Sequence, residues 1–130
     1  MSARLALVAA PILMAVAVAL GAFGAHALKA RVAPEMLSAW QTGVTYHAWH
    51  AIGLFLLGLL MLQAPQSAAF RIAAWLFAAG IVLFAGSLYL LALGAPRWVG
   101  AITPLGGVSF IAGWIAIAAG VWAWRTGSEL

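Results

Sequence analysis

The sequence predicts an all-α integral membrane protein: a four-transmembrane-helix bundle with a short interfacial helix between the first and second helices. Two observations support this prediction. Of the 130 residues, 67% are hydrophobic and only 6% are charged, whereas a soluble domain is about half apolar and about one quarter charged. Four stretches also lack charged residues over the roughly 20 positions that a helix needs to cross a bilayer. We therefore expect a single membrane domain over residues 1–130.

The four spanning helices are expected at about 5–27, 43–63, 68–93 and 104–124. The first of these stretches ends in Ala25-His26-Ala27 and so imitates a secretory signal peptide with its cleavage site. Its apolar run is longer than that of a typical signal peptide. We therefore expect it to be retained as a helix.

The connection between the first two helices is too long for a simple turn. Pro34 suits the first turn of a helix, and apolar residues follow it at helical spacing. The segment 34–42 is therefore expected to lie in the membrane interface as a short amphipathic helix, after which Gly43 turns the chain into the bilayer. Thr103 before Pro104 is a typical capping pair and predicts the start of the fourth helix.

Small residues recur every seven positions in the third and fourth helices. The two sets are Ala73, Gly80, Ser87 and Gly94, and Gly106, Gly113 and Gly120. Seven residues make about two helical turns, so each set lies along one stripe of its helix. Such stripes let helices approach closely in lipid, which favours helix packing over a glycine-lined pore.

Polar side chains gather toward the membrane face opposite the termini. The candidate ligand or partner site there comprises His26, Tyr46, His47, His50, Tyr89 and Thr103. His47 and His50 are three residues apart and share a helix face. His26 ends the first helix where the second begins, so the three imidazoles are expected at similar depth and within a few ångströms of one another.

Three interpretations of these histidines remain open. Hydrogen bonding to Tyr46, Tyr89 or Thr103 is the favoured one, because imidazoles readily bond across membrane helices. A zinc or copper site on His26, His47 and His50 is the second, although Glu35 is the only carboxylate nearby. A lipid, quinone or proton-linked role is the third. Haem fits less well because His47 and His50 share one helix, and we expect no cofactor.

Loop charges are balanced between the two sides of the membrane. One side carries Arg4, Arg71 and Arg125, and the other carries Lys29, Arg31 and Arg97. The second group is expected to contact lipid headgroups. Because each side carries three basic residues, the positive-inside rule does not decide the orientation of the protein. The signal-like start favours cytoplasmic termini in a bacterial inner membrane.

Composition also limits the function. The six basic residues are scattered, which fits anionic lipid headgroups as partners and excludes a nucleic-acid patch. With no cysteine and no catalytic motif, the chain is not expected to be an enzyme.

The leading hypothesis is a non-enzymatic accessory or assembly partner, or a binder of a lipid or other hydrophobic molecule through the His/Tyr cluster near one membrane face. A small dimeric transporter or channel is the alternative, because the balanced charges permit dual insertion. A His-based metal-binding protein is third, and partnership with a larger membrane complex or a second copy fits the first two.

Several segments together resemble a known family. They are GAFGAHALK at 21–29, WQTGVTYH at 40–47, HA at 50–51, GSLYL at 86–90 and TPLGG at 103–107. In these segments the chain is similar to the YgdD-like family of small bacterial inner-membrane proteins, domain of unknown function family 423, which has small eukaryotic transmembrane relatives. The resemblance covers nearly the whole chain. It implies a four-helix membrane protein without an assigned activity.

Overall fold

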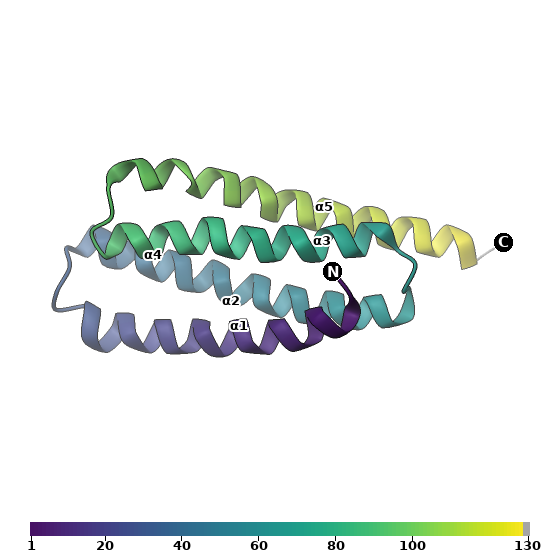
Figure 1. The fold of residues 1–130 in the computed structure, drawn as a ribbon, viewed down its shortest axis with the longest axis horizontal. Coiled ribbons are helices and arrows are strands. Elements are labelled where there is room, and N and C mark those ends of the chain that lie inside the picture. Colours follow the sequence, from purple (N-terminus) through teal and green to yellow (C-terminus); the bar gives the residue numbers. More distant parts are fainter. Residues whose placement is uncertain (129–130) are drawn as a thin grey trace.

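The computed structural model describes residues 1–128, which form helices joined by short connections and contain no β-strand (Figure 1). Four spans are long and apolar enough to cross a membrane: Ala3–Leu28, Pro34–Gln63, Ala68–Ala92 and Arg97–Trp124. The predicted all-α, four-span membrane architecture is therefore confirmed.

Each span is one helix or a series of helical segments. In chain order they are α1 (Ala3–Phe23), η1 (Gly24–Leu28), α2 (Pro34–Gln63), α3 (Ala68–Gly80), η2 (Ile81–Ala85), α4 (Gly86–Ala92), η3 (Arg97–Ala101) and α5 (Thr103–Ser128). The segments η1 and η2 are single π-helical turns within the first and third spans. Serine hydroxyls cap two helix starts: Ser2 accepts from the Leu5 N–H at 3.2 Å, and Ser67 accepts from the Phe70 N–H at 3.3 Å.

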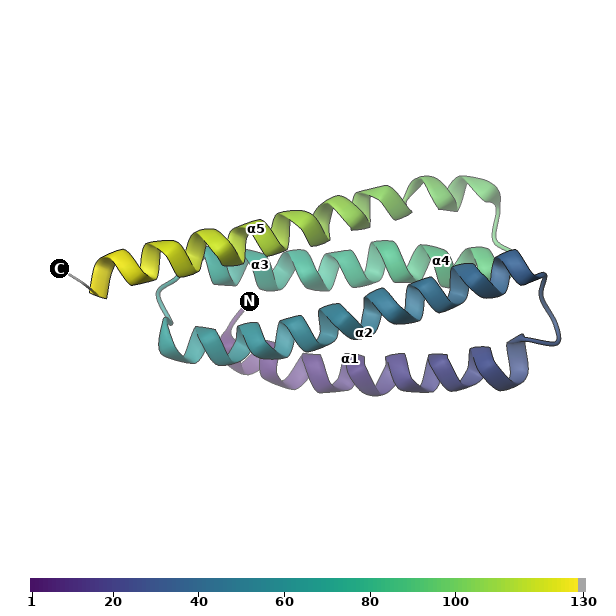
Figure 2. The same ribbon diagram turned by 180° about the vertical axis from the view of Figure 1, so that it is seen from behind.

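The spans run antiparallel, in the spatial order α1, α2, α3 with α4, and α5 (Figures 1 and 2). Helix α1 packs on α2, while α5 packs on α3 and η2. The N-terminus and the C-terminal end of α5 lie at one end of the bundle with the α2–α3 connection, and the other two connections lie at the opposite end (Figure 1). Helix α2 therefore has neighbours on two sides and is the centre of the molecule.

The prediction of a separate interfacial helix at 34–42 is wrong, because these residues form the first turns of α2. Gly43 is an ordinary helical residue against the ring of Tyr89, and it does not turn the chain. Trp40 is only 2% exposed, and its indole N–H donates to the Leu20 carbonyl of α1 at 2.9 Å. Trp40 thus joins the start of α2 to α1, although most of the other residues at 34–42 are exposed.

The glycine stripe of α5 packs against phenylalanines of the third span. The pairs are Gly120 with Phe70, Gly113 with Phe77 and Gly106 with Phe84, and Phe110 of α5 faces Gly80 in return. A Cβ atom at Gly113 would lie 2.6 Å from Phe77 Cδ1, a distance at which no side chain fits. The rings of Phe70 and Phe77 and the Phe84 backbone fill the stripe, which confirms packing over a pore. Gly94 is the exception, because it lies in a connection with φ +96°.

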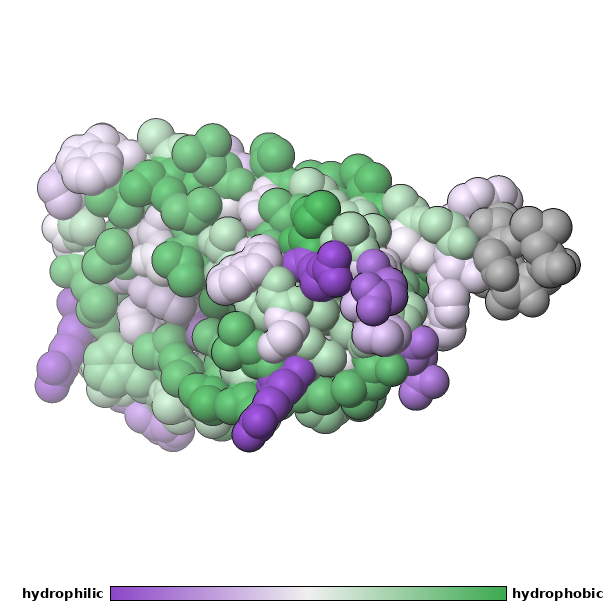
Figure 3. Space-filling view, turned by 45° about the vertical axis from the view of Figure 1, so that its right-hand side comes forward, coloured by the Kyte–Doolittle hydropathy of each residue, from purple (hydrophilic) through white to green (hydrophobic). Residues whose placement is uncertain are grey.

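The outer surface is apolar. Figure 3 shows hydrophobic side chains over most of the face in view, with hydrophilic side chains in a few separate places. Large apolar residues such as Val18 and Ile115 are about two thirds exposed, at 65% and 64%. In water such a surface would aggregate, whereas in a bilayer it contacts lipid.

Candidate functional site

The two α2 histidines lie near the middle of their helix. His47 follows Pro34 by 13 residues, which corresponds to roughly 20 Å along the helix axis. The expectation that His47 and His50 open the second helix is wrong, because α2 begins nine residues before the predicted start at 43.

His26 lies apart from the other two histidines. It is exposed on η1, where Gly24 packs against Trp40 and Gly21 against Val44. This register places His26 level with the first turns of α2, roughly 13 Å along the axis from the level of His47. The expected meeting of three imidazoles is therefore wrong. Among the described residues, no three histidine or acidic side chains lie close enough to hold a metal ion, which removes the His26, His47 and His50 site.

His50 has hydrogen-bond partners at both ring nitrogens. Its Nδ1 lies 2.7 Å from the Tyr46 carbonyl oxygen, and its Nε2 lies 3.2 Å from Trp114 Nε1 of α5. An indole N–H only donates and a carbonyl only accepts. His50 is therefore neutral, with its proton on Nδ1 donated to Tyr46 and with Nε2 accepting from Trp114; this tautomer is assigned from the partners.

Aromatic rings surround His50 on the α5 side of α2. Its imidazole stacks on Phe110, with ring centroids 3.4 Å apart and planes 10° apart, and it meets the edge of Phe77 at 5.2 Å. The Tyr46 ring packs on Phe84 at 4.7 Å. His50 is 4% exposed. Both nitrogens and the ring face are thus occupied by the protein itself.

His47 is different, although it is equally buried at 3% exposure. Its Nδ1 lies 3.2 Å from the Tyr89 hydroxyl of α4. Its Nε2 is buried and has no hydrogen-bond partner among the described residues. The backbone of Leu13 on α1 lies near the imidazole but forms no hydrogen bond with Nε2. An unsatisfied buried polar atom costs about 1–3 kcal/mol, so native structures seldom keep one without a reason.

Thr103 bonds to neither histidine. Its hydroxyl lies 2.7 Å from that of Ser87, which in turn donates to the Phe84 carbonyl at 2.9 Å. Of the hydrogen bonds expected for the histidines, those to Tyr89 and Tyr46 are present, the latter through the Tyr46 backbone. The predicted cluster therefore divides into His47 with Tyr89 and His50 with Tyr46, and it does not include His26 or Thr103.

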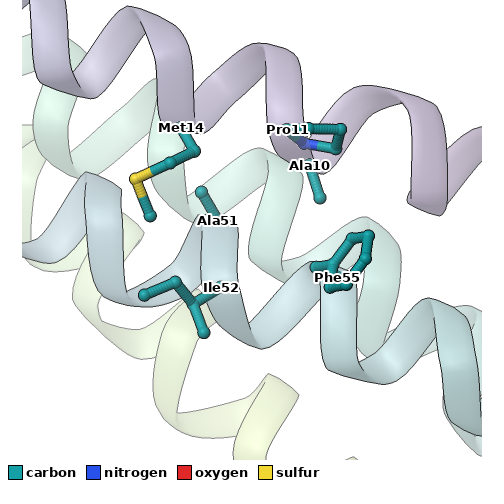
Figure 4. A pocket seen from close by; sticks show the side chains of 6 residues that line it. All are labelled: Ala10, Pro11, Met14, Ala51, Ile52 and Phe55. Carbon is teal, nitrogen blue, oxygen red and sulfur yellow. The ribbon is translucent and has the colours of Figure 1, made fainter.

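A cavity of about 240 Å³ lies between α1 and α2 (Figure 4). Its lining residues are apolar: Ala10, Pro11, Met14, Ala51, Ile52 and Phe55. Figure 4 shows Met14 and Phe55 at opposite ends. Because His47 precedes Ala51 by one turn and Phe55 follows Ala51 by one turn, the end formed by Met14 is the one nearer to His47.

The residues that complete these sites were not singled out from the sequence. They are Trp40, Phe110 and Trp114. Phe110 and Trp114 lie four residues apart on α5 and therefore share one face of that helix. The phenylalanines at 70, 77 and 84 repeat with the same period of seven as the glycines of α5. This shared period was the sequence signal that could have predicted the packing of α5 on the third span.

The basic residues Lys29, Arg31 and Arg97 are exposed on or beside the two connections at the end opposite the termini. Within residues 1–128, none of the three forms an ion pair with Glu35 or takes part in a side-chain hydrogen bond. Their positions are compatible with headgroup contacts.

Comparisons with known proteins place this chain among bacterial membrane proteins. A family model described as "Protein of unknown function (DUF423)" matches residues 20–107. The chain is 50% identical over 101 residues to the UPF0382 membrane protein YwdK of Bacillus subtilis, covering 78% of this chain and 82% of that protein. It is 46% identical over 101 residues to a UPF0382 membrane protein of Staphylococcus epidermidis, covering 78% and 81%.

A UPF0382 membrane protein of Staphylococcus saprophyticus is 44% identical over 104 residues, covering 80% of this chain and 85% of that protein. No solved structure matches the chain. The names of these relatives state membrane location and no activity. With four apolar spans and a family model that matches most of its length, this chain belongs to the DUF423 family, a family of membrane proteins of unknown function.

Proposed function

We propose that this protein is a non-enzymatic binder of a bilayer-soluble hydrophobic molecule, held in the cavity between α1 and α2. One observation carries the proposal: an apolar cavity lies one helical turn from His47, whose Nε2 is buried without a partner among the described residues. Ligand sites combine apolar walls with a few polar groups that orient the ligand. A buried ionisable side chain within a membrane span also marks a functional site by default.

A hollow of about 400 Å³ also lies on the α5 side of α2, but its histidine is already engaged. Both nitrogens of His50 are bonded to Tyr46 and Trp114, and its ring face is covered by Phe110. A ligand in that hollow could bond to His50 only by displacing an existing hydrogen bond. Binding next to His47 would instead supply a partner to an atom that lacks one.

The cavity walls argue against chemistry on the bound molecule. The six residues that line it carry no hydroxyl, carboxyl, amide or basic group. General acid–base or nucleophilic catalysis needs such a group within hydrogen-bond reach of the reacting atom. Its volume of about 240 Å³ is below the usual range of about 300–1,000 Å³ for ligand pockets, so it would hold one part of a longer molecule whose remainder lies in the bilayer.

The same proposal includes a place in the cell. We infer a bacterial inner-membrane protein with both termini in the cytoplasm, and with Lys29, Arg31 and Arg97 at the headgroups of the opposite leaflet. The N-terminus and the C-terminal end of α5 lie at the same end of the bundle, which supports placing both on the same side of the membrane. Reporter fusions to either terminus should both be active on the cytoplasmic side; activity of both on the outer side would reverse the assignment.

Methionine methyl groups provide a direct test of cavity binding. Met14 lines the cavity, whereas Met36 on the first turn of α2 does not. The protein, labelled with carbon-13 at methionine methyls, would be reconstituted in phosphatidylglycerol nanodiscs and titrated with heptadecane and with 2-heptadecanone. At least one probe should shift the Met14 signal saturably and leave the Met36 signal unchanged.

Two tryptophan substitutions sharpen this test. Ile52→Trp places an indole in the mouth of the cavity, because Ile52 lines it and is 49% exposed. Ile115→Trp is the matched control on the lipid-facing surface of α5, at 64% exposure. The first substitution should abolish the saturable Met14 shift and the second should preserve it. If neither probe shifts Met14 in the wild-type protein, the proposed function is wrong.

A further inference from the structure

We infer that the bound molecule carries an uncharged acceptor oxygen, such as a ketone, quinone or ester carbonyl, which accepts a hydrogen bond from Nε2–H of His47. This inference rests on the proposed function and specifies the chemical class of its ligand. It follows from the proton positions in the His47–Tyr89 pair, the location of the pair beside the cavity, and the charges around it.

The proton positions follow from counting partners. If His47 Nδ1–H donated to the Tyr89 oxygen, the hydroxyl proton of Tyr89 and the lone pair of Nε2 would both lack partners among the described residues. If the Tyr89 hydroxyl donates to Nδ1, only one group lacks a partner, namely Nε2–H. The second arrangement leaves fewer unsatisfied polar groups. His47 is therefore assigned as the neutral Nε2–H tautomer, and the free group is a donor.

The location of the ring directs this donor toward α1. Nδ1 bonds to Tyr89 of α4, and the Leu13 backbone of α1 lies near the imidazole without a hydrogen bond to Nε2, so Nε2 is assigned to the α1–α2 contact. Leu13 is adjacent in sequence to Met14, which forms the nearer end of the cavity (Figure 4).

Met14 is the one unbranched, flexible side chain among the residues that line the cavity, and it forms the end nearer to His47. An unbranched thioether has three rotatable bonds and adapts to a ligand more readily than a branched side chain. A molecule whose chain fills the cavity could therefore displace the Met14 side chain and bring its oxygen to Nε2.

The absence of charge at this level selects a neutral ligand. The cavity lining is entirely apolar, and Arg4, the charged residue of the first span, lies more than one helical turn before Ala10. Placing an anion at the middle of a membrane helix without a cationic partner is costly. A single neutral donor is therefore matched by a single neutral acceptor, not by a phosphate or a carboxylate.

Two probes and one pair of variants test this inference. Heptadecane and 2-heptadecanone have the same carbon chain and differ by one carbonyl oxygen. The wild-type protein should bind the ketone about three- to tenfold more tightly, as expected for one added neutral hydrogen bond. In the same titration, nitrogen-15 spectra of labelled histidine should show the Nε2–H tautomer of His47 and a shift of Nε2 with the ketone only.

His47→Gln and His47→Asn separate the two ring nitrogens. A glutamine amide reaches the position of Nε2 and keeps a donor there, whereas an asparagine amide keeps an acceptor for Tyr89 and ends before Nε2. The ketone preference should persist in His47→Gln and disappear in His47→Asn. The wild-type comparison of the two probes does not depend on either variant folding.

Failure of the inference is distinguishable from failure of the proposed function. Equal affinities for both probes, with a saturable Met14 shift, would reject the carbonyl class and leave cavity binding intact. An Nδ1–H tautomer of His47 would also reject it. No Met14 response to either probe would reject both.

Discussion

His50 and His47 are one helical turn apart on α2 and differ by roughly 60° about its axis, but they meet different neighbours. His50 faces α5, where an indole, a backbone carbonyl and a stacked phenyl ring occupy its polar atoms and its ring face. His47 faces α1 and α4, where one nitrogen meets Tyr89 and the other meets no partner among the described residues. Equal burial therefore accompanies two different roles: His50 joins helices, and His47 retains a free donor.

The helix contacts around the two histidines differ in the same way. On the α5 side, Gly113 and Gly120 receive the rings of Phe77 and Phe70, and Gly106 meets the Phe84 backbone, so α5 lies close to the third span. On the α1 side, Ala10 and Ala51 are among the residues that line the cavity of about 240 Å³. Small residues thus allow close packing of α5 on the third span, whereas at the α1–α2 contact they border a cavity.

The largest expected effect is on the closed side. In Gly106→Ala, the new Cβ would lie 2.7 Å from Phe84 Cα and still closer to the Phe84 nitrogen, and backbone atoms cannot rotate away. The variant should lose about 3 kcal/mol of unfolding free energy, at the upper end for overpacking. Denaturation followed by circular dichroism in mild detergent measures this loss.

Gly107→Ala is the control for that prediction. Its Cβ would lie 3.8 Å from Phe84 Cδ2, an ordinary van der Waals contact, and alanine favours helix over glycine. Its stability should equal or exceed that of the wild type. Equal losses in the two variants would contradict the close packing of α5 on the third span.

The histidines themselves provide the second prediction. His50→Leu removes two hydrogen bonds and leaves the Trp114 N–H unpaired, so it should cost about 2 kcal/mol. His47→Leu removes an unsatisfied nitrogen but leaves the Tyr89 hydroxyl alone, and the net change should be below about 1 kcal/mol. The same denaturation assay compares them. A larger loss for His47→Leu would show that His47, and not His50, is the structural residue.

The smallest expected effect concerns the attachment of α1 to α2. Trp40→Phe keeps an aromatic ring but removes the hydrogen bond to the Leu20 carbonyl, and it should cost about 0.6–1 kcal/mol, as for other interhelical bonds in membranes. Trp75→Phe, at a position of α3 that is 57% exposed, is the control and should be neutral. Indistinguishable stabilities would mean that the Trp40 bond contributes nothing to holding α1.

Much of the fold was predictable because its signals are local. Hydropathy depends only on composition within about 20 residues, and it located all four spans. The seven-residue spacing of Gly106, Gly113 and Gly120 predicted a packing stripe for the same reason. The start of α2 was predicted wrongly, because burial of Trp40 by α1 makes residues 34–42 part of a spanning helix, and that burial depends on another helix.

The sequence by itself determined that this chain is a four-helix membrane protein, that its helices pack through small residues, and that its histidines are the side chains to examine. Only the tertiary structure decided which histidine keeps a free nitrogen. His50 meets Trp114 across 64 positions of sequence and His47 meets Tyr89 across 42. Such partners depend on the rotation and register of whole helices, which Gly–Phe contacts fix and which no local pattern in α2 contains.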